Sequence, residues 1–93
     1  MDDLEFNIYL HERREQLDEL DRSIVRGLNE RARLVQELAA IKRQVGEPLY
    51  DPKREEEILQ RVAEENPGPI YNSTMREIFE IIMHRIRDIE FEL

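Results

Sequence analysis

The chain has 93 residues, of which 40% are hydrophobic and 39% are charged, and its formal net charge is −8. This length predicts one small domain spanning residues 1–93. The acidic balance argues against a nucleic-acid partner, since phosphate binding requires a basic surface. The absence of cysteine excludes disulfides and thiolate metal sites. No stretch resembles a signal peptide or a membrane span, so we expect a cytoplasmic protein without membrane contact.

A long amphipathic helix is predicted from about Leu4 to Val45, because this segment contains no proline and a single glycine, Gly27. Residues seven apart form two rows on one side of such a helix, here called the two-row face. The first row is Leu10, Leu17, Ile24, Arg31, Leu38 and Val45, and the second is Arg14, Asp21, Leu28, Val35 and Lys42. The helix would span roughly 60 Å, whereas a compact domain of this size has a radius of gyration of about 13 Å. We therefore expect a second copy of the chain to cover the apolar overhang.

Three cations, Arg14, Arg31 and Lys42, interrupt the two-row face, and Asp21 is its one acidic residue. A single arginine there would usually extend its charged end into water, and one buried polar residue can define coiled-coil register. Three buried cations need partners, which indicates an anionic ligand. Arg31 and Lys42 are about 16 Å apart along the helix and could converge on one small molecule. Arg14 lies about 25 Å from Arg31, so it would reach the pocket of the partner subunit.

Gly46 and Pro48 should end the long helix, with the glycine near its C-cap and the proline just beyond. A short second helix is predicted after this turn. Asp51 is a suitable N-cap, Pro52 suits the first helical position, and Glu55 begins a run of three glutamates near the positive end of the helix dipole. The Asn66-Pro67-Gly68-Pro69 segment should end this helix. Its apolar face comprises Ile58, Leu59, Val62 and Ala63.

A third helix of medium length is predicted to begin near residues 72–74, where Thr74 and Glu77 could form a capping box. Its apolar stripe comprises Met75, Ile78, Phe79, Ile82, Ile86, Ile89 and Leu93. No segment favours a strand. The expected fold class is therefore all-α, with one long, one short and one medium helix in each chain.

The chemistry available to this chain is mainly electrostatic. Arg54 and Glu55, at the start of the second helix, would lie beside free backbone donors. The guanidinium group of Arg54, together with the cations of the two-row face, would make a pocket suited to planar carboxylates, which guanidinium groups bind in a fork. His11 and His84 have no ligand spacing and are expected at the surface. The sequence contains no nucleophilic triad, phosphate loop or metal-ligand cluster, so we expect no metal and catalysis by positioning and electrostatics.

Taken together, these residues resemble the all-helical (AroQ-type) chorismate mutases over nearly the whole chain. The resemblance rests on the order and spacing of Arg14, Asp21, Asn29-Glu30-Arg31, Lys42, Tyr50-Asp51-Pro52-Lys53-Arg54-Glu55 and Glu90. The segments at 48–55 and 65–69 are also similar to mutase domains associated with 3-deoxy-D-arabino-heptulosonate 7-phosphate synthase. The resemblance implies an intertwined homodimer that converts chorismate, a dicarboxylate, to prephenate in aromatic amino-acid biosynthesis, without a cofactor.

The resemblance also implies a role for each candidate residue. Arg14 from the partner subunit and Arg31 would bind carboxylates, and Lys42 would face the ether oxygen whose bond breaks. Glu90 would donate a hydrogen bond to the same oxygen when protonated. The remaining substrate-binding candidates are Asp51 and Glu55, near the ring hydroxyl, and Arg54, which would balance the charge of the pocket.

Ile86 departs from the family pattern, because many members have a small hydroxyl residue four positions before the residue equivalent to Glu90. We expect Ile86 to belong to the core and not to contact substrate. Two other functions stay open at this point. One is an isochorismate-pyruvate lyase, which shares the fold and pocket, and the other is a non-catalytic helical dimerisation or regulatory module of a synthase.

Overall fold

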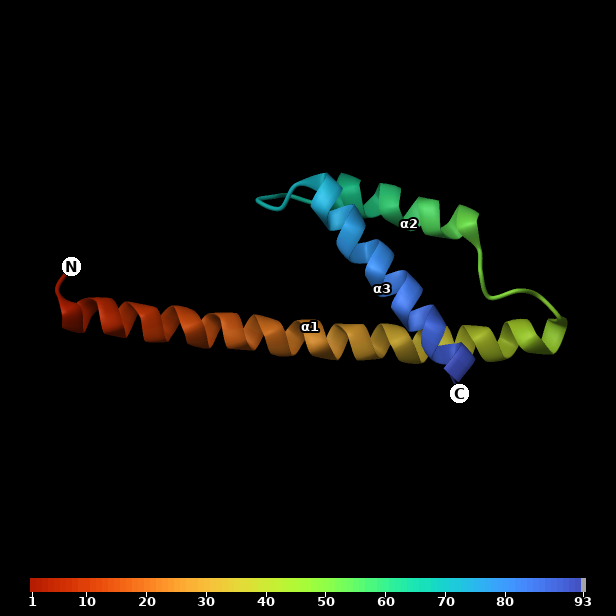
Figure 1. Ribbon diagram of the computed structural model, residues 1–93, viewed down its shortest axis with the longest axis horizontal. Helices are drawn as coiled ribbons and strands as arrows, with labels where there is room; N and C mark the ends of the chain where they lie inside the picture. The colour runs from red at the N-terminus through yellow and green to blue at the C-terminus, as the bar shows by residue number, and fades with distance from the viewer. Residues whose placement is uncertain (93) are drawn as a thin grey trace. The chain divides into compact units, whose positions relative to one another are not determined.

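The computed structural model describes the backbone of residues 1–92 and the side chains of residues 1–89, and it contains three helices (Figure 1). These are α1 (Asp3–Val45), α2 (Pro52–Glu65) and α3 (Asn72–Glu92). The predicted all-α class and the long, short and medium helix lengths are confirmed. The chain divides into two units, residues 1–31 and the part from residue 32 onward, and each is described separately below.

Helix α1 has capping groups at both ends. The Asp2 carboxylate accepts a hydrogen bond from the backbone N–H of Glu5 at 2.8 Å, which satisfies one of the free donors of the first turn. At the other end, Gly46 has φ 73°, and the N–H of Glu47 donates to the carbonyl of Lys42 at 2.9 Å. Glycine adopts this left-handed conformation without a steric penalty, so the predicted glycine stop is confirmed. No helix in the described part of the chain is long and apolar enough to cross a lipid bilayer.

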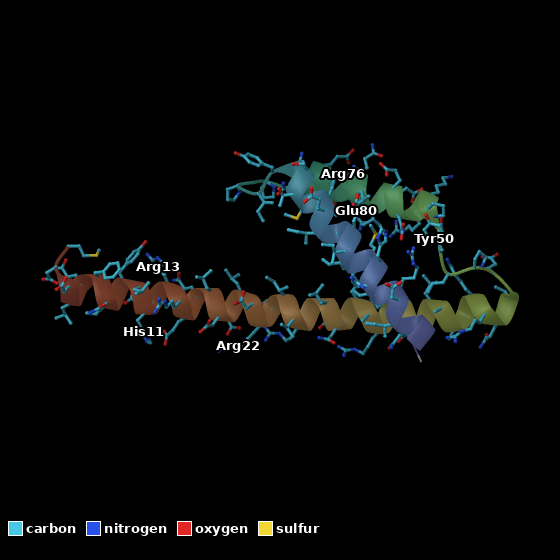
Figure 2. All side chains as sticks on the ribbon, in the orientation of Figure 1. His11, Arg13, Arg22, Tyr50, Arg76 and Glu80 are labelled. Carbon is cyan, nitrogen blue, oxygen red and sulfur yellow. The ribbon has the colours of Figure 1, made fainter. Side chains whose placement is uncertain are left out.

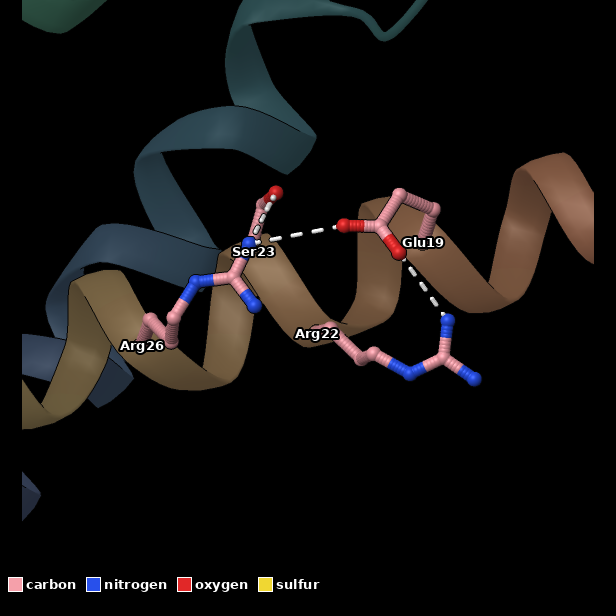
Figure 3. Close-up of polar contacts among 4 residues, drawn as sticks. All are labelled: Glu19, Arg22, Ser23 and Arg26. Carbon is pink, nitrogen blue, oxygen red and sulfur yellow. Dashed lines mark hydrogen bonds and ion pairs between the residues drawn. The ribbon is translucent and has the colours of Figure 1, made fainter.

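The first unit consists largely of α1 up to residue 31, and most of its large apolar side chains are exposed, with Leu10 and Leu28 partly buried. Leu17, Leu20 and Ile24 are 57%, 61% and 58% exposed. Glu19 forms polar contacts with neighbouring residues on the helix surface. Glu19 pairs with Arg22 at 3.0 Å and with Arg26 at 3.6 Å, as Figure 3 shows. Such exposed pairs contribute little to stability. The exposed leucines and isoleucine form an uncovered apolar face between these charged residues.

Helix α2 begins as the sequence predicts. Asp51 is the N-cap in an extended conformation, and its carboxylate accepts a hydrogen bond from the backbone N–H of Arg54 at 3.0 Å. The Asp51 carbonyl accepts from the N–H of Glu55 at 3.0 Å, and Pro52 is the first helical residue. The helix ends at Glu65, with Asn66 as its C-cap.

The connection between α2 and α3 is organised by the Asn66 side chain. Its amide nitrogen donates to the carbonyl of Ile70 at 2.7 Å and to the side-chain oxygen of Asn72 at 2.8 Å, and its amide oxygen accepts from the N–H of Gly68 at 3.2 Å. Helix α3 therefore begins at Asn72. The predicted capping box at Thr74 is wrong, because Thr74 lies inside the first turn and not at its boundary.

Helices α2 and α3 pack against each other in the second unit (Figure 1). Their core consists of Ile58, Leu59 and Met83, with Val62 and Phe79 packed around it. Ala39 of α1 and Ile86 of α3 are also buried. The apolar face predicted for α2 is confirmed for Ile58, Leu59 and Val62, and its fourth member, Ala63, is partly buried. The stripe predicted for α3 is correct only in part. Ile78 and Ile89 are 41% and 39% exposed, whereas Met83, which was not predicted, is buried. Leu93 lies outside the described residues.

Candidate functional site

The three cations predicted for the site all lie in α1. Arg14 is exposed, whereas Arg31 and Lys42 are partly buried. Arg14 and Arg31 belong to the same unit and are separated by almost five helical turns. Within one chain, these two guanidinium groups therefore cannot contact the same small molecule. The spacing in the sequence predicts this separation.

The first turn of α2 brings Asp51, Arg54 and Glu55 together. Asp51 is held by its capping hydrogen bond to the Arg54 backbone. The Arg54 side chain lies 3.7 Å from a carboxylate oxygen of Glu57, and both side chains are more than half exposed. An exposed pair of this kind is weak, so Arg54 can turn toward an anionic ligand. The expected free backbone donors at Arg54 and Glu55 are not found, because both N–H groups are bonded to Asp51. The positive end of the helix dipole still favours an anion at this turn.

Glu55 has a specific partner on α3 that the sequence-based prediction missed. The Arg87 guanidinium donates to Oε1 of Glu55 at 2.8 Å, and the two side chains are 22% and 20% exposed. The same guanidinium lies 4.5 Å from the centre of the Tyr50 ring, a cation–π contact. The sequence carried no local signal for this contact. Arg87 lies one helical turn after Met83, and only the structure shows that Met83 belongs to the core between α2 and α3.

The two histidines lie at the surface, as predicted. His11 forms an i, i+4 contact with Glu15 at 3.1 Å on α1. His84 is half-exposed, and its Nε2 lies 3.6 Å from Oε2 of Glu55. This distance is beyond a hydrogen bond, so Arg87 is the closer partner of the Glu55 carboxylate. Among residues 1–89, no three acidic or histidine side chains are grouped so that they could hold a metal ion.

Ile86 is buried, with 9% of its surface exposed. The prediction that Ile86 belongs to the core is therefore confirmed. Glu90 lies in α3, but its side chain is outside the part of the chain that the structure describes. Its predicted role stays a prediction.

The chain matches the family model "Chorismate mutase type II" over residues 13–91. It is 34% identical to a bifunctional chorismate mutase/prephenate dehydratase from Aquifex aeolicus over 86% of this chain and 21% of that protein. It is 42% identical to a chorismate mutase from Methanocaldococcus jannaschii over 57% of this chain and 54% of that protein.

A solved structure with a similar fold is chorismate mutase (form II) from Thermus thermophilus, with a TM-score of 0.86 and 43% identity. The alignment covers 88% of this chain and 93% of that one. The coverage of the bifunctional relative is much lower, because this chain spans only 21% of the length of the Aquifex protein. The similarity to that protein therefore concerns the part of it that aligns with this chain.

Proposed function

Because the chain belongs to the type II chorismate mutase family, we propose that it converts chorismate to prephenate in the biosynthesis of phenylalanine and tyrosine. The observation that carries this proposal is the extent of the family match. Residues 13–91 include every candidate site residue, from Arg14 to Glu90. The helix arrangement supports the same conclusion, since a chorismate mutase structure aligns with 88% of the chain.

The proposed reaction is a Claisen rearrangement, in which a C–O bond breaks while a C–C bond forms within one molecule. Arg31 and Arg14 of the partner subunit bind the two carboxylates of chorismate. Guanidinium groups bind carboxylates in a fork, so the pair holds the substrate in its compact, reactive conformation. Arg54 adds positive charge beside them. No covalent intermediate and no cofactor is needed.

Lys42 and Glu90 act on the ether oxygen. Negative charge grows on this oxygen as the C–O bond breaks, so a fixed ammonium group stabilises the transition state more than the substrate. Glu90 donates a hydrogen bond to the same oxygen in its protonated form. Partial burial of Lys42 supports this role, because a charge shielded from water interacts more strongly.

The proposed assembly is an intertwined homodimer with two equivalent sites. The uncovered apolar side chains of the first unit support it, since soluble monomers rarely expose large contiguous apolar surfaces. Leu17, Leu20 and Ile24 are each more than half exposed, and a second α1 would cover them. The dimer would also bring Arg14 of one subunit to the site that contains Arg31 of the other, whereas Arg14 and Arg31 of the same chain are too far apart to share a site.

The experiment that tests the function follows the ultraviolet absorbance of chorismate when the purified chain is added. We expect the absorbance to fall faster than in the uncatalysed reaction, with prephenate as the product. A rate equal to the uncatalysed background would contradict catalysis by this chain and would favour a non-catalytic helical module. A parallel assay with isochorismate tests the lyase alternative, which predicts release of pyruvate.

The wider context of the domain belongs to the same proposal. Residues 1–93 would act as one mutase domain in the cytoplasm. The sequence resemblance suggests association with a 3-deoxy-D-arabino-heptulosonate 7-phosphate synthase, whereas the Aquifex aeolicus relative is a bifunctional protein with prephenate dehydratase. Co-purification of the native protein with synthase activity would support the first association, and co-purification with dehydratase activity would support the second.

A further inference from the structure

Arg87 lies on α3, outside the set of residues assigned to substrate, yet it contacts the chain on both sides of Asp51. It donates to the Glu55 carboxylate at 2.8 Å and lies 4.5 Å from the centre of the Tyr50 ring. Tyr50 precedes the N-cap of α2, and Glu55 lies in its first turn. One side chain therefore joins α3 to the segment that carries three of the proposed substrate-binding residues.

This contact is better shielded from water than the Arg76–Glu56 ion pair, which also joins α2 and α3. The side chains of Arg87 and Glu55 are 22% and 20% exposed, whereas those of Arg76 and Glu56 are 38% and 64% exposed and 3.5 Å apart. Less water around a pair means less screening of its charges. Arginine also suits both contacts at once, because its planar group can donate to a carboxylate and interact with a ring.

We propose that Arg87 is a positioning residue that holds the first turn of α2 in its substrate-binding geometry by anchoring Tyr50 and Glu55. This inference rests on the proposed function, because it assumes that the first turn of α2 binds the ring hydroxyl of chorismate. Arg87 occupies Oε1 of Glu55. Oε2 is then the oxygen that accepts a hydrogen bond from the substrate, with the half-exposed His84 3.6 Å away.

The reaction chemistry determines which kinetic constant should change. The ring hydroxyl takes no part in the bonds that break or form, so its contacts are equally strong in the substrate and in the transition state. Loss of such contacts raises KM and leaves kcat nearly unchanged. A residue that only stabilised the fold would instead change the melting temperature, without a selective rise in KM below that temperature.

The experiment compares Arg87→Met, which keeps the length of the side chain, with Arg87→Lys, which keeps its charge. For Arg87→Met we expect KM for chorismate to rise about tenfold, the ratio typical of a lost charged hydrogen bond, while kcat changes much less. Arg87→Lys should recover part of the affinity. In the Glu55→Gln background, Arg87→Met should have little further effect, because residues that act through one contact are not additive.

Arg76→Met is the matched control. It removes an arginine that pairs across the same two helices. Figure 2 shows Arg76 and Tyr50 near opposite ends of the α2–α3 pair. We expect its KM to equal that of the wild-type protein. A second control is Tyr50→Phe, which keeps the ring under the guanidinium and should leave KM unchanged, whereas Tyr50→Leu should raise it.

Amide hydrogen exchange provides a readout that does not need activity. The N–H groups of Arg54 and Glu55 are bonded to Asp51, so they should exchange faster in Arg87→Met than in Arg76→Met. An unchanged KM with wild-type exchange would overturn the role of Arg87 while leaving the mutase function intact. An inactive wild-type chain would overturn the function, and the exchange comparison would still decide whether Arg87 orders this turn.

Discussion

Lys42 is the residue on which the proposed chemistry depends most. It lies in the last turn of α1 and is partly buried. The ammonium group is proposed to meet charge that exists only in the transition state, so its removal should affect turnover more than binding or folding.

We predict that Lys42→Ala lowers kcat by about 100-fold or more, the usual effect of losing one preorganised electrostatic donor. The free energy of unfolding should change little, because the side chain is not part of the core. Steady-state kinetics and denaturant titration measure the two quantities. The control is Lys53→Ala, which removes an exposed lysine of α2 and should keep wild-type turnover. A normal kcat in Lys42→Ala would remove the assignment of Lys42 to the ether oxygen.

Glu90 carries the second prediction at this scale. A carboxyl group donates a hydrogen bond only while it holds its proton, so activity should decrease as the pH rises and Glu90 ionises. The amide of Glu90→Gln donates at every pH, and this variant should therefore have a flatter profile of kcat against pH. A variant whose profile matches that of the wild-type protein would argue against a protonated Glu90.

At the scale of elements, α2 carries both structure and proposed function in its first turn. Asp51 caps the helix through a 3.0 Å hydrogen bond to the N–H of Arg54. The same carboxylate is proposed to lie near the substrate hydroxyl. Substitution can separate these two roles, because asparagine caps a helix about as well as aspartate but carries no charge.

We predict that Asp51→Ala lowers the free energy of unfolding by about 1 kcal/mol, the typical effect of losing an N-cap. Asp51→Asn should retain wild-type stability. Both variants should have a higher KM if the carboxylate binds substrate. Urea titration at one fixed protein concentration, together with steady-state kinetics, measures these effects. Equal stability of Asp51→Ala and the wild-type protein would contradict the capping role.

At the scale of the whole molecule, the shared-site proposal depends on Arg14 and Arg31 coming from different subunits. Almost five helical turns separate them within one chain. In a two-fold symmetric dimer each site takes Arg31 from one subunit and Arg14 from the other, so each mixed dimer of Arg14→Ala and Arg31→Ala chains retains one intact site.

We predict that mixing these two inactive variants restores about one quarter of the wild-type activity, because random pairing makes half of the dimers mixed, each with one working site. The chains must be unfolded and refolded together so that subunits exchange. Light scattering should give twice the 11.3 kDa mass of the chain. Doubling the amount of either variant alone is the control and should restore nothing. Failure to recover activity in confirmed mixed dimers would mean that the sites are not shared.

The elements were predictable because their signals are local. Periodic apolar residues, the Asp51 cap and Gly46 act within a few positions of the chain, and the bounds of α1 and α2 accordingly agree with the prediction. The start of α3 at Asn72 also agrees with the prediction, but the predicted capping box at Thr74 was wrong, and the structure instead has Asn66 reaching six residues forward to Asn72. No local capping pattern contains that contact.

By itself, the sequence determined the three helices, the cations on one face of α1 and the first turn of α2 as candidate site components. Only the tertiary structure decided which side of α3 packs on α2, and therefore that Met83 is core and that Arg87 reaches Tyr50 and Glu55. The reason is physical. Helical periodicity shows which residues share a face, but the choice of a partner 32 residues away depends on how two helices pack.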